Sequence, residues 1–436
     1  MRYFFDFLFL IGLILILPFV VLKMITAGKY RRGIGQRFGF IPTPPGDGPL
    51  IWLHAVSVGE LQAARGLVAH LQEAYPSHRI AISHTTRTGE DVAAQLYPAL
   101  TRFYFALDFS FITRRVMRKL NPELIILMEL ELWPNFLLAA RAQKRKVFIA
   151  NGRISQSSSD GYRKAAFALA KPFQAITLAA VQDEEYASRL RALFGRMQVD
   201  EERVHVAGNL KFDNISIGVN EVARLRYREL FGFNDDEIVL VCGSTHPGEH
   251  EELVELYKRI RNQGTNLRMV VVPRHPERWT GVRTLWRQAG VALVDRSSLG
   301  SGRMMAVNDG SGIAPCVLLD TMGELSDLYN AGDVVFIGGS MIPHGGQNMA
   351  EPAGLGRAVC FGPHTKNFKS TVRDLLEAKA AIQVHTWDEL QATIIRLAGD
   401  PAEREQLGQR AQVVVQAGKG SVEEHMKLIK GLLSAE

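Results

Sequence analysis

The chain has 436 residues, of which 47% are hydrophobic and 22% charged, with a formal net charge of +6 at pH 7. This length exceeds one ordinary hydrophobic core, so we expect two or three globular domains rather than a disordered chain. Three widely separated cysteines without a CxxC pair argue against a disulfide framework or a thiolate metal site, and they suit a reducing compartment. No basic stretch is interleaved with aromatic residues, so nucleic acid is not an expected partner.

The first element is an unbroken apolar run at residues 7–22. Counted from Tyr3, the segment is just long enough to cross a bilayer as one helix. Only Arg2 precedes it, whereas five basic residues follow it, namely Lys23, Lys29, Arg31, Arg32 and Arg37. This asymmetry favours an uncleaved, single-pass anchor with the body in the cytoplasm over a signal peptide or a monotopic segment. We therefore predict an anchor at residues 1–27 and a basic, Pro/Gly-rich linker at residues 28–48, both beside anionic membrane lipids.

Strands and helices alternate through a first domain at residues 49–213. The predicted strands are 50–53, 79–83, 102–106, 124–128, 146–150, 175–181 and 204–207, with helices at 60–75 and 90–96. Alternation of this kind predicts an α/β domain with a parallel sheet wound on both faces, in which ligands bind at the carboxyl ends of the strands.

Charged residues follow several of these strands. Glu60 could be a general base, but Ser57 and Glu60 also match the capping box at a helix start. Glu129 and Glu131 end a buried strand, which is costly unless they are hydrogen-bonded or open to a cleft. Arg153 follows another strand and suits either an anionic substrate or a surface salt bridge.

A second α/β domain is expected at residues 214–400, after a hinge at residues 208–213, with closing helices at 401–436. Its predicted strands are 237–242, 268–272, 317–319, 334–337 and 358–361, with helices at 251–260, 324–330 and 388–398. Arg274 leaves a strand end between two prolines, so a rigid support would hold its guanidinium for a phosphate.

Residues 336–368 are the most distinctive stretch of the chain. A strand is followed by the glycine pairs 338–339 and 345–346, then by a helix pattern near Asn348, then by a second strand. This order is typical of a phosphate site, because glycines let backbone amides approach an anion near a helix start. Glu351 could serve that site, although Asn348 and Glu351 also match a capping box.

Taken together, six segments resemble one family in the same order: 54–60, 129–135, 208–213, 273–275, 320–325 and 336–368. The chain resembles the 3-deoxy-D-manno-octulosonic acid (Kdo) transferases, from the anchor to near the C-terminus. This resemblance implies a GT-B fold, with two Rossmann-like domains facing a cleft. It also implies an inverting, metal-independent glycosyltransferase that moves Kdo from CMP-Kdo to a lipid A precursor, lipid IVA, in lipopolysaccharide biosynthesis. Such an enzyme needs no cofactor and works at the cytoplasmic face of the bacterial inner membrane.

The same resemblance assigns roles to individual residues. Glu60 would be the general base, while Glu131 or Glu129 and Lys211 would assist the transition state. The CMP moiety would be held by Pro273, Arg274, Met322, Gly323, Glu324, Asn348, Met349, Ala350 and Glu351. The chain departs from the expected pattern at Gln347, Met349 and Arg357, where His, Pro and Lys are usual, and slightly at 151–155. No DxD pair or His/Asp cluster offers a metal site.

Two alternatives remain open at the level of sequence. One is another membrane-associated GT-B enzyme, such as a UDP-sugar transferase or epimerase. The other is an inactive, membrane-anchored binding protein, which would leave Glu60, Lys211 and Arg274 without a reason to coexist. The number of Kdo units transferred depends on the shape of the acceptor pocket and is not encoded in a motif.

Overall fold

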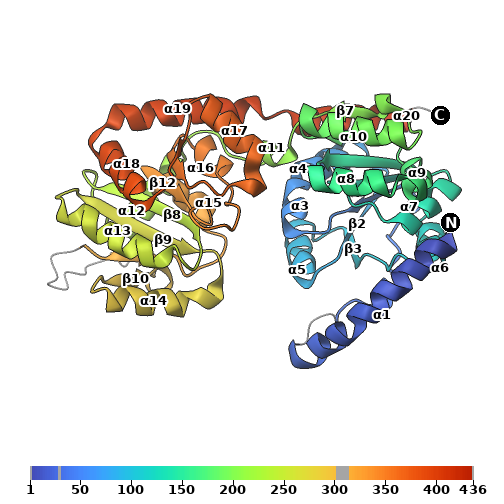
Figure 1. The fold of residues 1–436 in the computed structure, drawn as a ribbon, viewed down its shortest axis with the longest axis horizontal. Coiled ribbons are helices and arrows are strands. Elements are labelled where there is room, and N and C mark those ends of the chain that lie inside the picture. Colours follow the sequence, from blue (N-terminus) through green and yellow to red (C-terminus); the bar gives the residue numbers. More distant parts are fainter. Residues whose placement is uncertain (1, 28–30, 301–313, 435–436) are drawn as a thin grey trace. The chain divides into compact units, whose positions relative to one another are not determined.

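The computed structural model describes residues 2–27, 31–300 and 314–434, and it divides into two compact units (Figure 1). The first unit comprises Met1–Asn214 together with Gly418–Glu436, and the second comprises Ile215–Ala417. The second unit is therefore inserted into the chain of the first, which is completed only by the C-terminal segment.

The first unit is built on a parallel sheet of seven strands within the described residues, in the order β3-β2-β1-β4-β5-β6-β7. The strands are β1 (Leu50–His54), β2 (Arg79–His84), β3 (Thr101–Tyr104), β4 (Leu124–Met128), β5 (Lys146–Gly152), β6 (Leu178–Val181) and β7 (Val204–Val206). Strands β1 and β4 are buried along their whole length, as expected of apolar runs covered on both faces.

Helices cover both faces of this sheet. They are α1 (Arg2–Ala27), α2 (Ile34–Arg37), α3 (Val58–Ala63), α4 (Arg65–Ala74), α5 (Arg87–Leu96), α6 (Ser110–Leu120), α7 (Pro134–Ala142), α8 (Gln156–Lys164), α9 (Ala166–Phe173), α10 (Glu184–Arg196), α11 (Leu210–Asp213) and α20 (Ser421–Ser434). The side chains of β4 alternate between two cores. Ile126 packs in the core that contains α4 and α20, whereas Ile125 packs in the core that contains α6 and α7.

The second unit repeats this architecture with a parallel sheet in the order β10-β11-β9-β8-β12-β13-β14. Its strands are β8 (Ile238–Thr245), β9 (Leu267–Pro273), β10 (Leu293–Asp295), β11 (Cys316–Leu318), β12 (Val334–Ile337), β13 (Ala358–Phe361) and β14 (Ile382–Gln383). Its helices are α12 (Glu221–Leu230), α13 (His250–Asn262), α14 (Trp279–Gln288), α15 (Leu325–Leu328), α16 (Ala350–Gly354), α17 (Lys369–Glu377), α18 (Trp387–Gly399) and α19 (Pro401–Ala417). The two parallel sheets confirm the predicted α/β class.

Several predicted segments differ from the observed ones. The helix expected at 60–75 is divided at Ala64 into α3 and α4, and the expected hinge loop 208–213 contains the short helix α11. The segment 401–436, expected as one closing piece, is also divided, because α19 packs in the second unit and α20 in the first. Within the expected linker 28–48, residues 28–30 lie outside the described residues. The following residues are not a free linker, since Ile41 is buried and its carbonyl accepts a hydrogen bond from Lys119 at 2.5 Å.

Helix α20 is held on the rest of the first unit by hydrogen bonds near its start and within the core. The Asp213 carboxylate accepts hydrogen bonds from the backbone N–H groups of Gly420 and Val422, both at 2.7 Å. Inside the unit, buried His425 accepts from the backbone N–H of Asn151 at 3.0 Å, and its other ring nitrogen lies 2.6 Å from the carbonyl oxygen of Ser421. Burial lowers the pKa of His425 to about 4, so the ring is neutral and can accept that bond.

Replacing Asp213 by Ala should therefore destabilise the first unit. Two backbone amides at the start of α20 would lose their acceptor, which costs roughly 1–3 kcal/mol. Urea unfolding of the purified protein, followed by a signal from the first unit, measures this loss. The control is Asp213→Asn, which keeps one carbonyl oxygen and should lose less. Equal midpoints for all three proteins would show that α20 is not held by Asp213.

Candidate active site

The carboxyl ends of β1 and β4 form the point in the first sheet where the strand order reverses. Loops that follow adjacent strands on either side of such a point run in opposite directions and leave a crevice between them. The loop after β1 leads to Glu60, and the loop after β4 carries Glu129 and Glu131. The fold therefore gathers the three predicted catalytic carboxylates at one edge of one sheet.

Glu60 lies in the first turn of α3 and is only 6% exposed. Its backbone N–H donates to the hydroxyl of Ser57 at 3.2 Å. Its two carboxylate oxygens accept from the Ser57 hydroxyl at 2.7 Å and from the Val56 N–H at 2.8 Å. Burial raises the pKa of Glu60, the bond from Ser57 acts in the opposite direction, and the negative charge of Glu129 adds to the rise. The helix-capping and functional interpretations are thus compatible, since the cap fixes the carboxylate while burial makes it more basic.

Glu129 and Glu131 occupy different electrostatic environments. Glu129 adopts a left-handed backbone conformation (φ 56°), and its carboxylate pairs with Arg153 at 2.6 Å and with Lys211 at 3.6 Å. The salt bridge that the sequence allowed for Arg153 is therefore present, with Glu129 as its partner. Burial raises the pKa of Glu131 to about 7, and the nearby Glu60 adds to this shift, while a hydrogen bond with Trp133 opposes it.

Two residues outside the predicted set hold Lys211 in place. The side-chain oxygen of Asn151 accepts from the backbone N–H of Leu210 at 3.1 Å, at the start of α11. Asn151 is itself held in a left-handed conformation (φ 56°) by His425 of α20. Asn151 belongs to a motif that the sequence singled out for Arg153, but nothing in the sequence pointed to His425, which lies far away in the chain.

His54 is buried at the end of β1. One ring nitrogen lies 2.9 Å from the hydroxyl of Ser83, and the ring stacks on Phe105 with centroids 3.9 Å apart. Burial lowers its pKa to about 3, so His54 is neutral and packs beneath the loop that leads to Glu60.

In the second sheet the strand order reverses between β8 and β12, so the loops after these two strands border the corresponding crevice. The first glycine pair lies here, but its amides are already occupied. The fully buried Glu249 accepts from the backbone N–H groups of Gly339 at 2.8 Å, Ser340 at 3.1 Å and Met341 at 3.2 Å, and from that of His246 at 3.0 Å. The expectation that this turn cradles a phosphate is therefore wrong, because an internal carboxylate takes that place.

A group of imidazole rings lies beside this loop. The rings of His246 and His344 have centroids 3.9 Å apart, those of His246 and His275 are 5.6 Å apart, and Gln347 lies 3.1 Å from His246 through its amide nitrogen. Burial lowers the pKa of His246 to about 4, and the neighbouring His344, His275 and Arg274 add to the decrease. Sequence reasoning did not select His246, although it directly follows β8 and so satisfies the same strand-end rule.

Arg274 follows β9, next to β8 in the sheet. Its backbone N–H donates to the carbonyl of Thr245 at 3.0 Å, and the preceding Pro273 is buried, so the main chain is held while the arginine side chain is exposed. This is the rigid support that the sequence predicted.

Glu351 links two loops of the second unit. Its carboxylate accepts from the side-chain amide of Asn348 at 2.8 Å and from the hydroxyl of Ser326 at 2.9 Å. Helix α16 begins only at Ala350, and its N-cap residue Met349 makes no side-chain capping bond. The reciprocal capping box of Asn348 and Glu351 is therefore not observed, although the side-chain oxygen of Asn348 accepts from the backbone N–H of Ala350, the first residue of α16, at 3.1 Å. Their contacts bring the segment after β12 next to the start of α15.

The segment 322–324 precedes α15. Met322 is 72% exposed, and Gly323 has a positive φ of 86°, which favours glycine. Glu324 accepts from Arg296 at 3.0 Å and from the Tyr227 hydroxyl at 3.1 Å. Burial alone would raise the pKa of Glu324, but hydrogen bonds, among them that from Arg296, lower it overall. Glu324 thus holds the loop, whereas Met322 is free to contact a ligand.

Within residues 2–27, 31–300 and 314–434, no group of three or more His, Cys, Asp or Glu side chains is arranged to hold a metal ion.

A solved structure of a glycosyltransferase also has two doubly wound sheets. The fold is similar to that of a glycosyltransferase from Rickettsia africae, with a TM-score of 0.58 and 11% identity over 90% of this chain and 100% of that one. The molecule therefore has the GT-B fold of glycosyltransferases, as predicted.

Sequence relatives define the family more narrowly. Residues 32–214 match the family described as 3-deoxy-D-manno-octulosonic-acid transferase (kdotransferase). The chain is 32% identical to the 3-deoxy-D-manno-octulosonic acid transferase of Haemophilus influenzae over 99% of both chains. It is also 32% identical to that of Bordetella pertussis, over 90% of this chain and 92% of the relative. The chain belongs to the Kdo transferase family and is a glycosyltransferase, which excludes the inactive binding protein.

The raised pKa of Glu131 predicts a pH-dependent contribution to stability. A carboxyl group whose pKa is higher in the folded than in the unfolded state favours folding most below its unfolded value, and that contribution is lost as the pH rises towards about 7. Glu131→Gln should therefore melt at a higher temperature than the parent at pH 8, with the difference shrinking or reversing at pH 5. Thermal unfolding of both proteins from pH 5 to pH 8 tests this. A difference that does not change with pH would contradict the shifted pKa.

Proposed function

We propose that this Kdo transferase moves Kdo from CMP-Kdo to a lipid A precursor, lipid IVA, by a metal-independent, inverting displacement. Glu60 carries the proposal, because it is buried, has a raised pKa and is held by two hydrogen bonds at the strand-order reversal of the first unit. Mass spectrometry of lipid IVA after incubation with CMP-Kdo and the protein tests it, with mass increments of Kdo as the expected result.

In this mechanism Glu60 takes a proton from the acceptor hydroxyl as that hydroxyl attacks the anomeric carbon of Kdo. A hydroxyl is a poor nucleophile, and a carboxylate with a raised pKa is a better base for it. One displacement, with CMP leaving from the opposite side, inverts the anomeric centre. Each carboxylate oxygen of Glu60 has one donor, which leaves a lone pair for the proton.

The neighbouring charges divide into two roles. Glu129 orients Lys211 and Arg153, and these cations stabilise negative charge that develops in the transition state. Glu131, with a pKa near 7, is the carboxyl group that can exchange a proton at neutral pH, and its pKa is raised in part by the charge of Glu60. Lys211 and Glu131 therefore assist, while Glu129 positions.

The donor binds the second unit in this proposal, and the acceptor binds the first. The exposed guanidinium of Arg274 neutralises the single phosphate of CMP-Kdo, which removes the need for a divalent cation to screen a diphosphate. Asn348 and Glu351 bind polar groups of the nucleoside. The remaining contacts come from the end of β9 (Pro273), from the loop after β11 (Met322, Gly323, Glu324), and from the end of the loop after β12 and the start of α16 (Met349, Ala350).

The location that fits this acceptor is the cytoplasmic face of the bacterial inner membrane. Helix α1 contains a candidate membrane segment, Tyr3–Thr26, with a mean hydropathy of 2.8 and a central window that is 0% buried. Anchoring raises the effective concentration of the enzyme near a lipid acceptor.

The alternative is a GT-B enzyme that uses a UDP-sugar as a transferase or epimerase substrate. Such an enzyme must bind a diphosphate and uracil. Calorimetry with CMP and with UDP separates the two, since the proposal requires binding of CMP and not of UDP.

Glu60→Gln should lose roughly 10²- to 10⁴-fold in turnover, because the amide keeps the shape of the side chain but cannot take a proton. The melting temperature and the affinity for CMP should stay near those of the parent. Glu60→Ala serves as the comparison, since it also loses the contacts to Ser57 and Val56 and should be less stable. Full activity of Glu60→Gln would make Glu131 the next candidate base.

Arg274→Ala should weaken CMP binding by the value of a charged phosphate contact, roughly 1.5–3 kcal/mol. Glu351→Gln should weaken it less, because glutamine still accepts from one neighbour. Calorimetric titration with CMP measures both. Affinities equal to that of the parent in both variants would place the nucleotide site elsewhere.

A further inference from the structure

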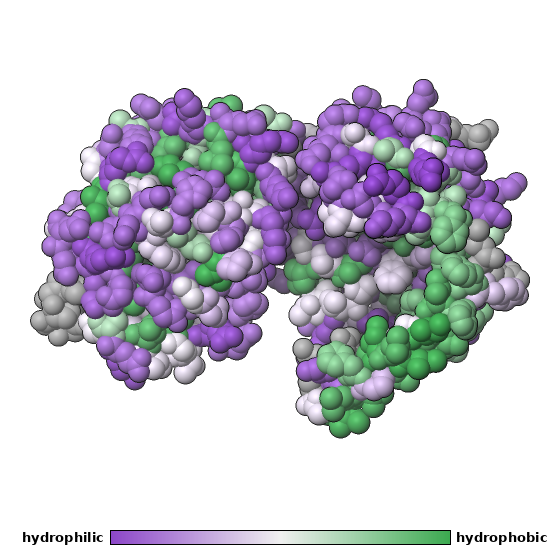
Figure 2. Space-filling view, viewed as in Figure 1, coloured by the Kyte–Doolittle hydropathy of each residue, from purple (hydrophilic) through white to green (hydrophobic). Residues whose placement is uncertain are grey.

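Helix α1 is apolar on nearly its whole surface, yet it carries one acidic residue in its second turn. Apolar residues cover α1 along its length, as Figure 2 shows. Asp6 does not point into this apolar surface. Its carboxylate accepts from the backbone N–H of Ser110 at 2.7 Å, from the Ser110 hydroxyl at 2.6 Å and from the Asn135 amide at 3.1 Å.

These bonds make Asp6 the cap of another helix. Ser110 is the first residue of α6, and its own N-cap position, Phe109, provides no side-chain capping bond. A carboxylate at a helix start satisfies orphan N–H groups and matches the positive end of the helix dipole. Asp6 therefore supplies from α1 the cap that α6 lacks in its own sequence.

Aromatic contacts reinforce this attachment. Phe5 is buried, and the ring of Phe9 meets that of Phe109 edge-on with centroids 5.0 Å apart. Phe109 in turn lies 5.7 Å from Phe111, which is 68% exposed, so the apolar surface of α1 continues onto α6.

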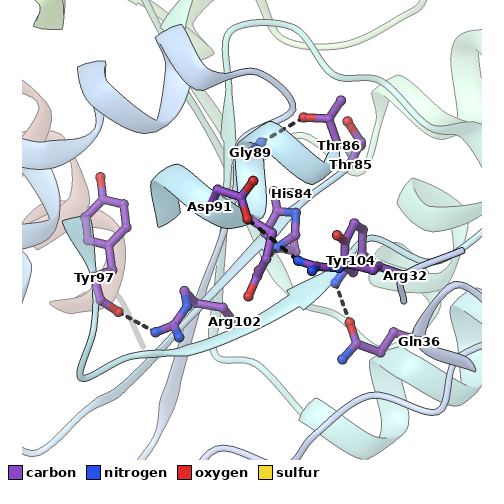
Figure 3. A network of polar contacts seen from close by, with 12 residues as sticks. Arg32, Gln36, His84, Thr85, Thr86, Gly89, Asp91, Tyr97, Arg102 and Tyr104 are labelled. Atoms are coloured by element: carbon purple, nitrogen blue, oxygen red, sulfur yellow. Dashed lines mark hydrogen bonds and ion pairs between the residues drawn. The ribbon is translucent and has the colours of Figure 1, made fainter. Parts of the chain in front are cut away.

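The chain that leaves α1 is held on the same unit. The side chain of Gln36 accepts from the backbone N–H of Tyr104 at 2.8 Å, and Arg32 lies 3.8 Å from Asp91 (Figure 3). The guanidinium of Arg37 lies over the ring of Tyr104. Both ends of α1 are thus attached to one folded body. On the N-terminal side the contact comes from Asp6, inside Tyr3–Thr26, and on the C-terminal side the contacts come from Arg32, Gln36 and Arg37, six to eleven residues after Thr26.

We propose that α1 lies parallel to the membrane surface instead of crossing the bilayer. Asp6 holds α1 against the folded body through its hydrogen bonds to Ser110 and Asn135. A crossing helix of this length carries its two ends to opposite sides of about 30 Å of hydrocarbon. Asp6 would then lie on the side away from the body, and its bonds to Ser110 and Asn135 could not exist. The proposal rests on the location given above, and it replaces the single-pass anchor that the sequence predicts.

The surface around α1 suits anionic lipid headgroups. Exposed basic residues lie just after α1 and along α6, namely Arg31, Arg32, Arg114, Arg115, Arg118 and Lys119. An apolar helix bordered by cations is the pattern of interfacial helices, which bury their apolar surface at the headgroup boundary.

The side of the membrane that the N-terminus occupies tests this proposal. A short Gly/Ser extension carrying one cysteine is placed before Met1 of the full chain, whose own described cysteines are all buried. A membrane-impermeant maleimide should label the extension in inside-out vesicles and leave it unlabelled in intact spheroplasts. Labelling in spheroplasts instead would overturn the in-plane helix. Recovery of the protein in the soluble fraction would overturn the membrane location itself.

A matched pair of variants tests whether the Asp6 contacts hold α1 on the body. Asp6→Ala removes the cap of α6 and should lower the melting temperature of the detergent-solubilised protein by about 2–4 °C. Phe7→Ala changes a neighbouring side chain that is 61% exposed and should leave the melting temperature unchanged. Asp6→Asn can still cap and should lie between Asp6→Ala and the parent. Identical melting of Asp6→Ala and the parent would show that α1 is not docked through Asp6.

Discussion

Burying a carboxylate at the edge of a parallel sheet is the constraint on which both units depend. An unpaired buried charge is costly, so each such group must be hydrogen-bonded, paired with a cation or protonated. Glu249 is hydrogen-bonded by four backbone amides, and Glu129 is paired with Arg153 and Lys211. Glu60 has two donors, and Glu131 has a pKa near 7. Glu60 and Glu131, the two groups proposed to take part in proton transfer, are those whose charge is least completely balanced.

In the second unit, an internal carboxylate and close packing between strands determine the shape of the glycine-rich turn. In the second unit the Glu249 carboxylate fixes the turn after β12, and Gly338 is required because a Cβ there would lie 2.5 Å from the carbonyl oxygen of Ser244. The glycines thus serve close packing between β8 and β12. The backbone amides of residues 339–341 therefore already have an acceptor and are not available to a ligand phosphate.

Sequence reasoning located strands well and long-range contacts poorly. Strands such as Leu124–Met128 were predicted at their observed bounds, because a fully buried parallel strand is a continuous apolar run between turn residues. Helix α6, in contrast, was missed, because its cap comes from Asp6, more than a hundred positions earlier in the chain. The helix cap at Glu60 could be predicted, since a capping box is a local pattern. Its burial and raised pKa could not, because they depend on tertiary packing. The contact of His425 with Asn151 had no local signal at all.

The interrupted chain of the first unit has a consequence for its synthesis. Helix α20 supplies Val422 and Ile429 to the core of that unit, and it leaves the ribosome only after the whole of the second unit. Until then the apolar face of β4 and α4 that α20 covers has no partner. The inserted second unit has its whole sequence available earlier, so it can fold while the first unit is still incomplete. Apolar surface that is exposed during synthesis is prone to aggregation, so the first unit carries this risk until α20 covers its core.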